Sequence, residues 1–262
     1  MPEGDTIHRA AVRVRDAFGH DPLTSFAVRT SAVARGAAPP ERGDAIASVE
    51  ARGKHLLLGF GNGTTLHTHL GMLGSWRVRS HFDPNLPHAR TGVAMATAAA
   101  GALCRSAPIV ELLDDAAVLR HPVLRALGPD LCVPDVDLDE VVRRTHGIAP
   151  DTAAGVVLLD QRVAAGIGNV YRSEVLWACG VDPWTPMDGL GDDGVRELYA
   201  TAATLLQMNL TARGPRRTVA EGLAVYERAG RACRRCGTVI RVDRLGDQAR
   251  SAWWCPSCQT RE

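Results

Sequence analysis

The sequence contains very little lysine. Of its thirty basic residues, twenty-nine are Arg and only Lys54 is Lys. A guanidinium stays protonated, whereas a lysine amine can lose its proton and act as a nucleophile or proton carrier. Lys54 therefore marks a position where an arginine would not serve. The alternative is that one lysine survives by chance.

The sequence also lacks a long apolar run. None reaches the ~18–20 residues that a membrane-spanning helix needs, and no basic segment precedes an apolar one as in a signal peptide. The composition, 45% hydrophobic and 23% charged over 262 residues, is typical of a globular protein with about two domains. We therefore expect a cytoplasmic protein with no membrane partner.

Cysteines are few and unevenly placed. Four of the seven follow the spacing C-x2-C-x18-C-x2-C, at Cys233, Cys236, Cys255 and Cys258. Each C-x2-C pair can place two thiolates on one tetrahedral ion, and four thiolates favour one zinc ion in a closed, structural site. Four chance cysteines are the alternative. We expect the scattered cysteines to be buried thiols. These are Cys104, Cys132 and Cys179.

Charge is distributed asymmetrically along the chain. Residues 213–262 contain eleven arginines against five acids, a net charge of +6, whereas residues 1–212 carry nineteen basic against twenty-four acidic residues. A basic C-terminal segment on an otherwise acidic protein indicates a polyanionic partner. A solvated basic face is the alternative.

Hydrophobic periodicity predicts a mixed α+β fold. A helix is expected over 6–18, capped by Asp5 or Thr6, followed from about 24 to 118 by short strands with a hairpin at "FGNGTT". Further helices are expected over 138–146, 150–161, 168–179 and 191–211. The cysteine-rich end is expected to form a short hairpin.

A glycine-rich turn interrupts the helical region. Gly166 and Gly168 would let the backbone approach a phosphate closely, and the next helix would add free N–H groups at its N-terminus. The amide of Asn169 is placed to bind the same phosphate. A tight turn between two helices with an Asn cap is the alternative reading.

Three separated stretches together resemble one family. They are "MPEGDT" at the N-terminus, "LLDQRVAAGIGNVYRSEVLW" at 158–177 and the four-cysteine segment. Over essentially its whole length the chain resembles the formamidopyrimidine-DNA glycosylase/endonuclease VIII family of bifunctional DNA glycosylases. The resemblance implies an N-terminal catalytic β-sandwich with flanking helices, a mainly helical helix–two-turns–helix domain that binds DNA, and a β-hairpin zinc finger. The expected boundaries are 1–128, a linker at 129–140, 141–228 and 229–262.

The same resemblance implies roles for individual residues. Pro2, exposed when Met1 is removed, would attack C1′ of a damaged nucleotide through its amine and form a Schiff base. Glu3 would handle protons on the sugar, and Lys54 would lie near the damaged nucleotide. Asn169, beside Gly168, and Arg250 would bind the DNA backbone.

The stretch "HLGMLGSWRV" (69–78) matches the loop that fills the space left by an extruded nucleotide. Met72 and Leu73 are the candidates for an apolar wedge, since an apolar filler offsets the cost of unstacking. His69 is a candidate phosphate contact. The alternative is that Met72 and Leu73 belong to the core.

The implied activity is base excision repair of damaged double-stranded DNA by a monomer, at the nucleoid when bound, with nicking by β- or β,δ-elimination. The sequence does not decide whether single-stranded or bubble DNA is also a substrate. The interval from Arg217 to Cys233 is too short for the loop that covers 8-oxoguanine, and "PEGDT" favours the endonuclease VIII branch and oxidised pyrimidines. "HLGM" resembles the purine branch, so a formamidopyrimidine/8-oxoguanine glycosylase is one alternative. A non-catalytic zinc-dependent DNA-binding protein and a protein-binding scaffold are the others.

Overall fold

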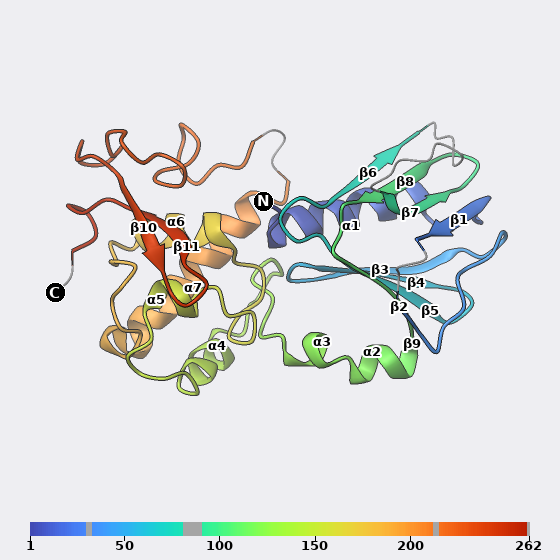
Figure 1. The fold of residues 1–262 in the computed structure, drawn as a ribbon, viewed down its shortest axis with the longest axis horizontal. Coiled ribbons are helices and arrows are strands. Elements are labelled where there is room, and N and C mark those ends of the chain that lie inside the picture. The colour runs from blue at the N-terminus through green and yellow to red at the C-terminus, as the bar shows by residue number, and fades with distance from the viewer. Residues whose placement is uncertain (30–32, 81–90, 212–214, 261–262) are drawn as a thin grey trace. The chain divides into compact units, whose positions relative to one another are not determined.

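The chain folds into two compact units, Met1–Ala126 and Leu127–Glu262 (Figure 1). The structure is a computed structural model that describes residues 1–29, 33–80, 91–211 and 215–260. Each unit is described below by itself. The mixed α+β fold expected from the sequence is confirmed.

The first unit opens with helix α1 (Gly4–Phe18), which starts earlier than predicted. Asp5 and Thr6 do not cap it but lie in its first turn. Glu3 occupies the N-cap position with an extended backbone (φ −129°, ψ −173°), and its carbonyl accepts hydrogen bonds from Thr6 N (3.0 Å) and Ile7 N (3.2 Å). The helix therefore begins directly after the second and third residues of the chain.

Within the described residues of the first unit, nine strands form two sheets. The five-stranded sheet has the order β2-β9-β5-β4-β3 and the four-stranded sheet the order β1-β7-β8-β6. All pairs are antiparallel except β2 with β9. The strands are β1 (Ser25–Val28), β2 (Val33–Arg35), β3 (Ile46–Arg52), β4 (His55–Phe60), β5 (Thr64–His69), β6 (Ser75–Arg79), β7 (Thr91–Ala96), β8 (Gly101–Arg105) and β9 (Ile109–Asp114). The predicted hairpin at "FGNGTT" is confirmed as the β4–β5 turn.

One apolar core joins both sheets to α1. Phe18 of α1, Leu58 of β4 and Met95 of β7 are all buried in the same cluster. The buried face of α1 follows the i, i+3, i+4, i+7 pattern of an amphipathic helix, with Ile7, Ala10, Ala11 and Val14 inside. Each large side chain buried here contributes about 1.5–3 kcal/mol, so α1 and the chain start before it are firmly anchored.

The chain then continues through two short helices, α2 (Asp115–Arg120) and α3 (Pro122–Ala126), which lie along the five-stranded sheet (Figure 1). The Asp114 carboxylate caps α2 by accepting a hydrogen bond from Ala117 N at 2.6 Å. The residue between the two helices, His121, is buried.

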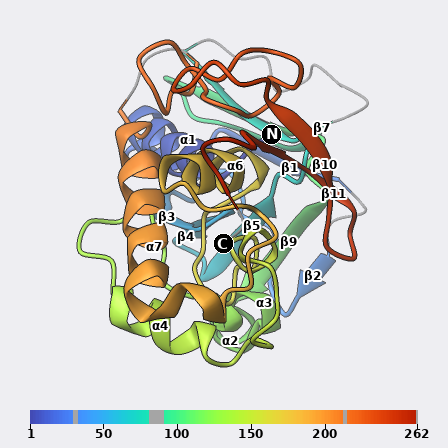
Figure 2. The same ribbon diagram turned by 90° about the vertical axis from the view of Figure 1, so that its left-hand side faces the viewer.

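The second unit is built around helices. They are α4 (Leu138–Thr145), α5 (Ala154–Val157), α6 (Asn169–Ala178), the 3₁₀ turn η1 (Asp188–Leu190) and α7 (Gly191–Met208). Figure 2 shows the long α7 beside α6. Their shared core contains Tyr171 of α6 and Tyr199 of α7, both fully buried.

The predicted helix over 150–161 is wrong in length, because α5 covers only four residues. At its start, Ala154 N and Gly155 N donate to Thr185 O and Pro183 O rather than to carbonyls of a preceding helical turn. After it the chain turns, and the Asp160 carboxylate accepts a hydrogen bond from Arg162 N at 2.9 Å. The bonds to the distant residues 183 and 185 and this local turn together override the helical periodicity.

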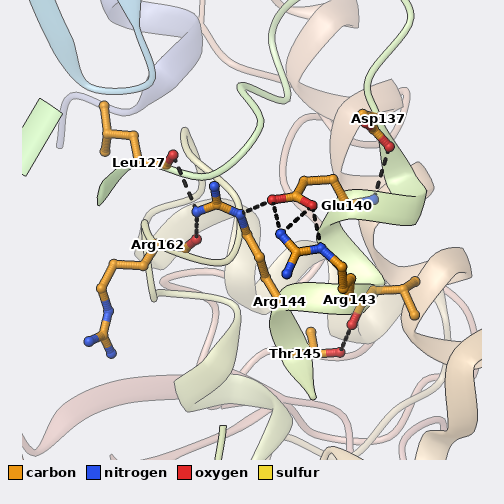
Figure 3. A network of polar contacts seen from close by, with 8 residues as sticks. Leu127, Asp137, Glu140, Arg143, Arg144, Thr145 and Arg162 are labelled. Carbon is orange, nitrogen blue, oxygen red and sulfur yellow. Dashed lines mark hydrogen bonds and ion pairs between the residues drawn. The ribbon is translucent and has the colours of Figure 1, made fainter. Parts of the chain in front are cut away.

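A network of charged groups ties α4 to its neighbours (Figure 3). Glu140 accepts hydrogen bonds from Arg143 and Arg144, and Arg144 Nη1 also donates to Arg162 O at 2.6 Å. The same Nη1 lies 3.4 Å from Leu127 O. Arg144 thus joins α4 to the start of the unit and to the segment before the glycine-rich turn.

The chain ends in a hairpin of β10 (Arg241–Leu245) and β11 (Arg250–Trp254). A small apolar cluster joins it to α6 through Trp177, which packs with Val225, Ile240 and Cys255. Among the described residues, no helix combines the length and apolarity needed to cross a membrane.

Candidate active site and metal centre

The N-terminal residues are fixed by the helix that follows them. Pro2 is half-buried and Glu3 fully buried, immediately before α1. Asp5, also fully buried, lies 3.5 Å from Arg9 Nη2 within the first turns of the helix. The arrangement places Pro2, the second residue of the chain, directly before an enclosed carboxylate.

Lys54 lies at a tight turn of the first unit. Arg52 and His55 are paired residues of β3 and β4, so Gly53 and Lys54 alone connect the two strands. Gly53 has a positive φ of 55°, which a glycine adopts without strain in such a turn. The half-buried lysine is therefore held on a short connection rather than on a flexible loop.

The loop between β5 and β6 exposes Met72 and Leu73 to solvent, with 75% and 83% of their surfaces accessible. Gly74 N donates to Leu70 O at 2.8 Å and closes the loop, and a Cβ on Gly74 would lie only 2.3 Å from that carbonyl oxygen. Gly71 N donates to His69 Nδ1 at 3.2 Å. Met72 and Leu73 are therefore not core residues, and the alternative raised by the sequence is excluded.

In the second unit, the glycine-rich turn and the hairpin meet. Gly168 is the N-cap of α6, and Gly166 has a φ of +119° that other residues rarely adopt. Asn169 Nδ2 donates to Ser251 O at 3.0 Å, and Arg172 Nη2 donates to the same oxygen at 2.5 Å. The start of α6 is thereby bound to β11.

Arg250 directly precedes Ser251, whose carbonyl accepts both of these hydrogen bonds, and Arg250 is exposed. Its Nε donates to Gln248 Oε1 at 2.8 Å. Because Asn169 and Arg172 hold Ser251, the structure brings Asn169 and Arg250 to one region of the second unit. An exposed arginine beside a helix N-terminus is suited to binding an anion.

The four cysteines of the C-x2-C pairs converge, with sulfur atoms all within 4.8 Å of one another. Cys233 Sγ lies 3.9 Å from Cys258 Sγ, and Cys236 Sγ lies 3.4 Å from Cys255 Sγ. Four thiolates bound to one zinc ion at about 2.3 Å stand about 3.8 Å apart, so the donor set fits one tetrahedral metal ion. Trp177 Nε1 donates to Cys233 Sγ at 3.4 Å and links the site to α6.

The other cysteines follow the prediction in part. Cys104 and Cys132 are buried, and burial raises the pKa of the Cys104 thiol to about 12. Cys179 is only half-buried.

Glu174 is a structural residue that sequence reasoning missed. Its buried carboxylate accepts hydrogen bonds from Ala224 N (2.7 Å), Val225 N (2.8 Å) and Tyr226 N (2.8 Å), and one from the Thr218 hydroxyl. It therefore fixes the segment between the helices and the four-cysteine hairpin. Its sequence signal, an acid within an apolar helix, was present in "YRSEVLW".

A buried histidine network was also missed. His55 Nδ1 lies 2.9 Å from His67 Nε2, and His67 Nδ1 lies 2.7 Å from Glu111 Oε2. His121 Nε2 lies 3.1 Å from the same oxygen. The alternation in "LHTH" places His67 and His69 on one face of β5, and this signal was not used.

Two family models match the chain. The formamidopyrimidine-DNA glycosylase N-terminal domain matches residues 1–105, and the formamidopyrimidine-DNA glycosylase H2TH domain matches residues 127–219. These matches place the chain in the class of DNA glycosylases that combine a formamidopyrimidine-DNA glycosylase N-terminal domain with an H2TH domain.

Curated relatives narrow this class. The chain is 40% identical over 269 residues to "Probable endonuclease 8 2" of Streptomyces coelicolor, covering 99% of this chain and 94% of the relative. It is 37% identical to "DNA-(apurinic or apyrimidinic site) lyase Nei2" of Mycolicibacterium smegmatis, covering 99% of each. The fold matches a Lactococcus lactis Fpg mutant crystallised with Fapy-dG-containing DNA, at a TM-score of 0.84, 22% identity and coverage of 99% and 100%. The chain belongs to the formamidopyrimidine-DNA glycosylase/endonuclease VIII family, which is the family and the enzyme class expected from the sequence.

Acid should destabilise the first unit through the histidine network. Burial, with the neighbouring His67, His69, His121 and Lys54, lowers the pKa of His55 to about 3. Burial, with Lys54 and His67, lowers the pKa of His69 to about 4. An unfolded histidine titrates near 6.5, so between about pH 6.5 and 4 the unfolded chain takes up protons that the folded chain does not. The free energy of unfolding should therefore fall over this range.

Urea unfolding at pH values between 7 and 4 measures this dependence. Hydrogen exchange of the β5 amides over the same pH range shows whether the loss of stability includes the first unit. His55→Gln should flatten it, whereas His20→Gln, at an exposed histidine, should leave it as in the wild type. An equal pH dependence in His55→Gln and the wild type would contradict the assignment.

Proposed function

We propose that this chain is a bifunctional DNA glycosylase/AP lyase of base excision repair that removes oxidised bases, pyrimidines preferentially, and then nicks the strand. The observation that carries the proposal is the anchored N-terminus, where Pro2 precedes the buried Glu3 at the start of α1. Family membership and the relatives' names, endonuclease 8 and apurinic/apyrimidinic lyase, support it.

The proposed nucleophile is the secondary amine of Pro2, uncovered when Met1 is removed. Its nitrogen attacks C1′ of the damaged nucleotide, the N-glycosidic bond breaks, and the base leaves with the electron pair and gains a proton as the amine loses one. The C1′–O4′ bond then breaks, O4′ takes the electron pair and a proton, and the C1′–N bond becomes an iminium. Glu3 is the proposed acid that moves protons on the sugar. An α-amino group titrates near about 8, so part of it is unprotonated at neutral pH.

Strand cleavage follows from the resulting iminium. Loss of a proton from C2′ and breakage of the C3′–O bond release the 3′ phosphate with the electron pair, which is β-elimination. A second elimination at C5′–O would release the 5′ phosphate, and water then hydrolyses the iminium to free the amine. Lys54 is proposed to lie near the damaged nucleotide and its phosphate.

Two sets of residues are proposed to hold the DNA. Gly168, Asn169 and Arg250 would bind the backbone beside the lesion, and the hydrogen bond from Asn169 to the carbonyl of Ser251, the residue after Arg250, supports their acting together. In the first unit, His69 would contact a phosphate, and the exposed Met72 and Leu73 would fill the space of the extruded nucleotide. Lactococcus lactis Fpg of the same fold was crystallised with abasic-site DNA.

We propose one structural zinc ion on Cys233, Cys236, Cys255 and Cys258. When bound, the ion closes the hairpin that carries Arg250, because the cysteines hold both of its ends. The Trp177 contact to Cys233 then fixes this hairpin against α6.

The preference for oxidised pyrimidines rests on the segment from Thr218 to Ala232. It is short, and Glu174 binds its backbone at Ala224, Val225 and Tyr226, which leaves no long loop to cover a purine lesion. The relatives named endonuclease 8 support the same branch. The proposed protein is a cytoplasmic monomer that binds damaged duplex DNA at the nucleoid.

Borohydride should trap a covalent protein–DNA adduct with duplexes that carry an abasic site, thymine glycol or 5-hydroxyuracil. Pro2→Gly should trap far less, and a tag retained before Pro2 should abolish trapping because it removes the amine. Comparing the adduct yield on a duplex with 8-oxoguanine with the yields on the pyrimidine lesions measures which class of lesion is preferred. Absence of an adduct on every duplex would contradict the lyase activity, and strongest trapping on 8-oxoguanine would contradict the pyrimidine preference.

Removal of the metal should weaken DNA binding, because the hairpin then loses its order. The measurement is fluorescence anisotropy with a duplex that carries a stable abasic-site analogue, before and after chelation and after zinc is restored. Arg250→Ala should lower the affinity and reduce the salt dependence by about one unit of slope. Unchanged affinity after chelation, with the metal shown to be lost, would contradict the role of the hairpin.

A further inference from the structure

The first unit contains a polar cluster that the proposed chemistry does not use. His55, His67, Glu111 and His121 are all buried, with 0–7% of their surfaces exposed. They come from β4, β5, β9 and the connection between α2 and α3. Buried polar side chains stabilise a fold only when their hydrogen-bonding groups are paired, so the pairing of these four is informative.

The hydrogen bonds determine which ring nitrogen carries each proton. Leu124 N donates to His121 Nδ1 at 3.2 Å, so the proton of a neutral His121 is on Nε2, where it donates to Glu111 Oε2. Hydrogen bonds and charge interactions with His67 and His121 lower the pKa of Glu111, although burial acts in the opposite direction. The carboxylate is therefore the acceptor for both rings.

The same reasoning extends to β4. His67 Nδ1 donates to Glu111 Oε2, so a neutral His67 accepts at Nε2, and the donor there is His55 Nδ1. Burial lowers the pKa values of His55 and His67, which keeps both rings neutral. The result is a directed chain of hydrogen bonds from His55 through His67 to Glu111, with His121 donating from the other side.

This pattern does not suit a metal ion, although His67, Glu111 and His121 form a group of potential ligands. Ligand atoms on one ion at about 2.1 Å stand about 3.4 Å apart, whereas His67 Nδ1 and Glu111 Oε2 are only 2.7 Å apart. The nitrogen of His121 that would bind the ion already carries the proton. The distances and tautomers are those of a hydrogen-bonded network.

The network ends at the turn that carries Lys54. His55 follows Lys54 directly, and its backbone pairs with Arg52 in β3 and with His69 in β5. The rings of His55 and His69 are in contact, with centroids 4.8 Å apart. His69 Nδ1 in turn accepts from Gly71 N, at the start of the loop with Met72 and Leu73.

We propose that Glu111, His67 and His121 are positioning residues that act through His55 to hold Lys54, and with it the Met72–Leu73 loop, in a single arrangement. The inference rests on the proposed function, because it assigns Lys54 a place beside the damaged nucleotide. No member of the network other than His55 is adjacent to Lys54 in the chain. Their effect on the reaction is therefore indirect and passes through the ring of His55.

A double-mutant cycle tests this role. Glu111→Leu leaves two buried N–H groups without their acceptor and should slow single-turnover cleavage of an abasic-site duplex about 10- to 100-fold, as small displacements of reacting groups do. Glu111→Gln should restore a rate close to wild type, since one carbonyl oxygen can accept both hydrogen bonds. In a Lys54→Ala background, Glu111→Leu should have little further effect.

Controls separate positioning from general loss of stability. Thr64→Val removes a partly buried hydrogen bond to Ala38 O at the opposite end of β5, and should lower the melting temperature without slowing cleavage. If Glu111→Leu does not fold, His55→Phe breaks the same link and takes its place in the cycle. The proposal would be overturned if the rate losses of Glu111→Leu and Lys54→Ala multiplied in the double mutant. It would also be overturned if Thr64→Val slowed cleavage as much as Glu111→Leu does.

Nitrogen NMR of the histidine rings tests the hydrogen-bond network without measuring enzyme activity. At pH 7.5, His55 and His67 should be neutral with protons on Nδ1, and added zinc or cobalt should leave their signals unchanged. His55 should stay neutral at pH 5.5. Titration of His55 near pH 6.5, or a metal-induced shift of His67 and His121, would overturn the network. If the wild type fails to cleave while these signals are as expected, the proposed function fails, and the positioning role fails with it.

Discussion

The burial of one face of α1 is the constraint on which the proposed catalytic centre depends. The second and third residues of a chain are normally among its most mobile, because few contacts hold them. Here the helix begins at Gly4, and Ile7, Val14 and Phe18 pack into the core that both sheets share. The packing fixes the start of the helix, so it also holds Glu3 and Pro2, whose amine is the proposed nucleophile. A nucleophile made from the chain terminus requires this rigidity.

In the second unit, the segment that must be held in place is the hairpin, and both apolar and polar contacts hold it. This hairpin is too small for a large core, so four kinds of interaction hold it against α6. Trp177 packs among Val225, Ile240 and Cys255, the Glu174 carboxylate binds the preceding segment, and the Ser251 carbonyl accepts from Asn169 and Arg172. Arg235 also stacks over the Trp177 ring, with its guanidinium carbon 4.1 Å from the ring centre. Arg250 thereby lies on a well-supported strand beside Asn169.

Features encoded in short stretches could be predicted from the sequence. The cysteine spacing predicts the cluster of four sulfur atoms, the apolar periodicity predicts α1 and α6, and "FGNGTT" predicts the β4–β5 turn. Features that depend on distant contacts could not. The helix predicted over 150–161 shrinks to α5 because the N–H groups at its start bond to 183–185. The histidine network joins residues 55 to 121 and depends on strand register, which no local pattern specifies. The roles of Pro2, Glu3, Lys54, Asn169 and Arg250 in the reaction stay predictions.

The scarcity of lysine makes the central claim unusually direct to test. After removal of Met1, the chain has two amines, the Pro2 nitrogen and Lys54 Nζ, and arginine cannot form a Schiff base because its guanidinium stays protonated. The measurement is peptide mapping by mass spectrometry of the borohydride-reduced adduct with an abasic-site duplex. The sugar remnant is predicted on the N-terminal peptide that begins with Pro2, with the peptide containing Lys54 unmodified. A remnant on Lys54 would contradict the account.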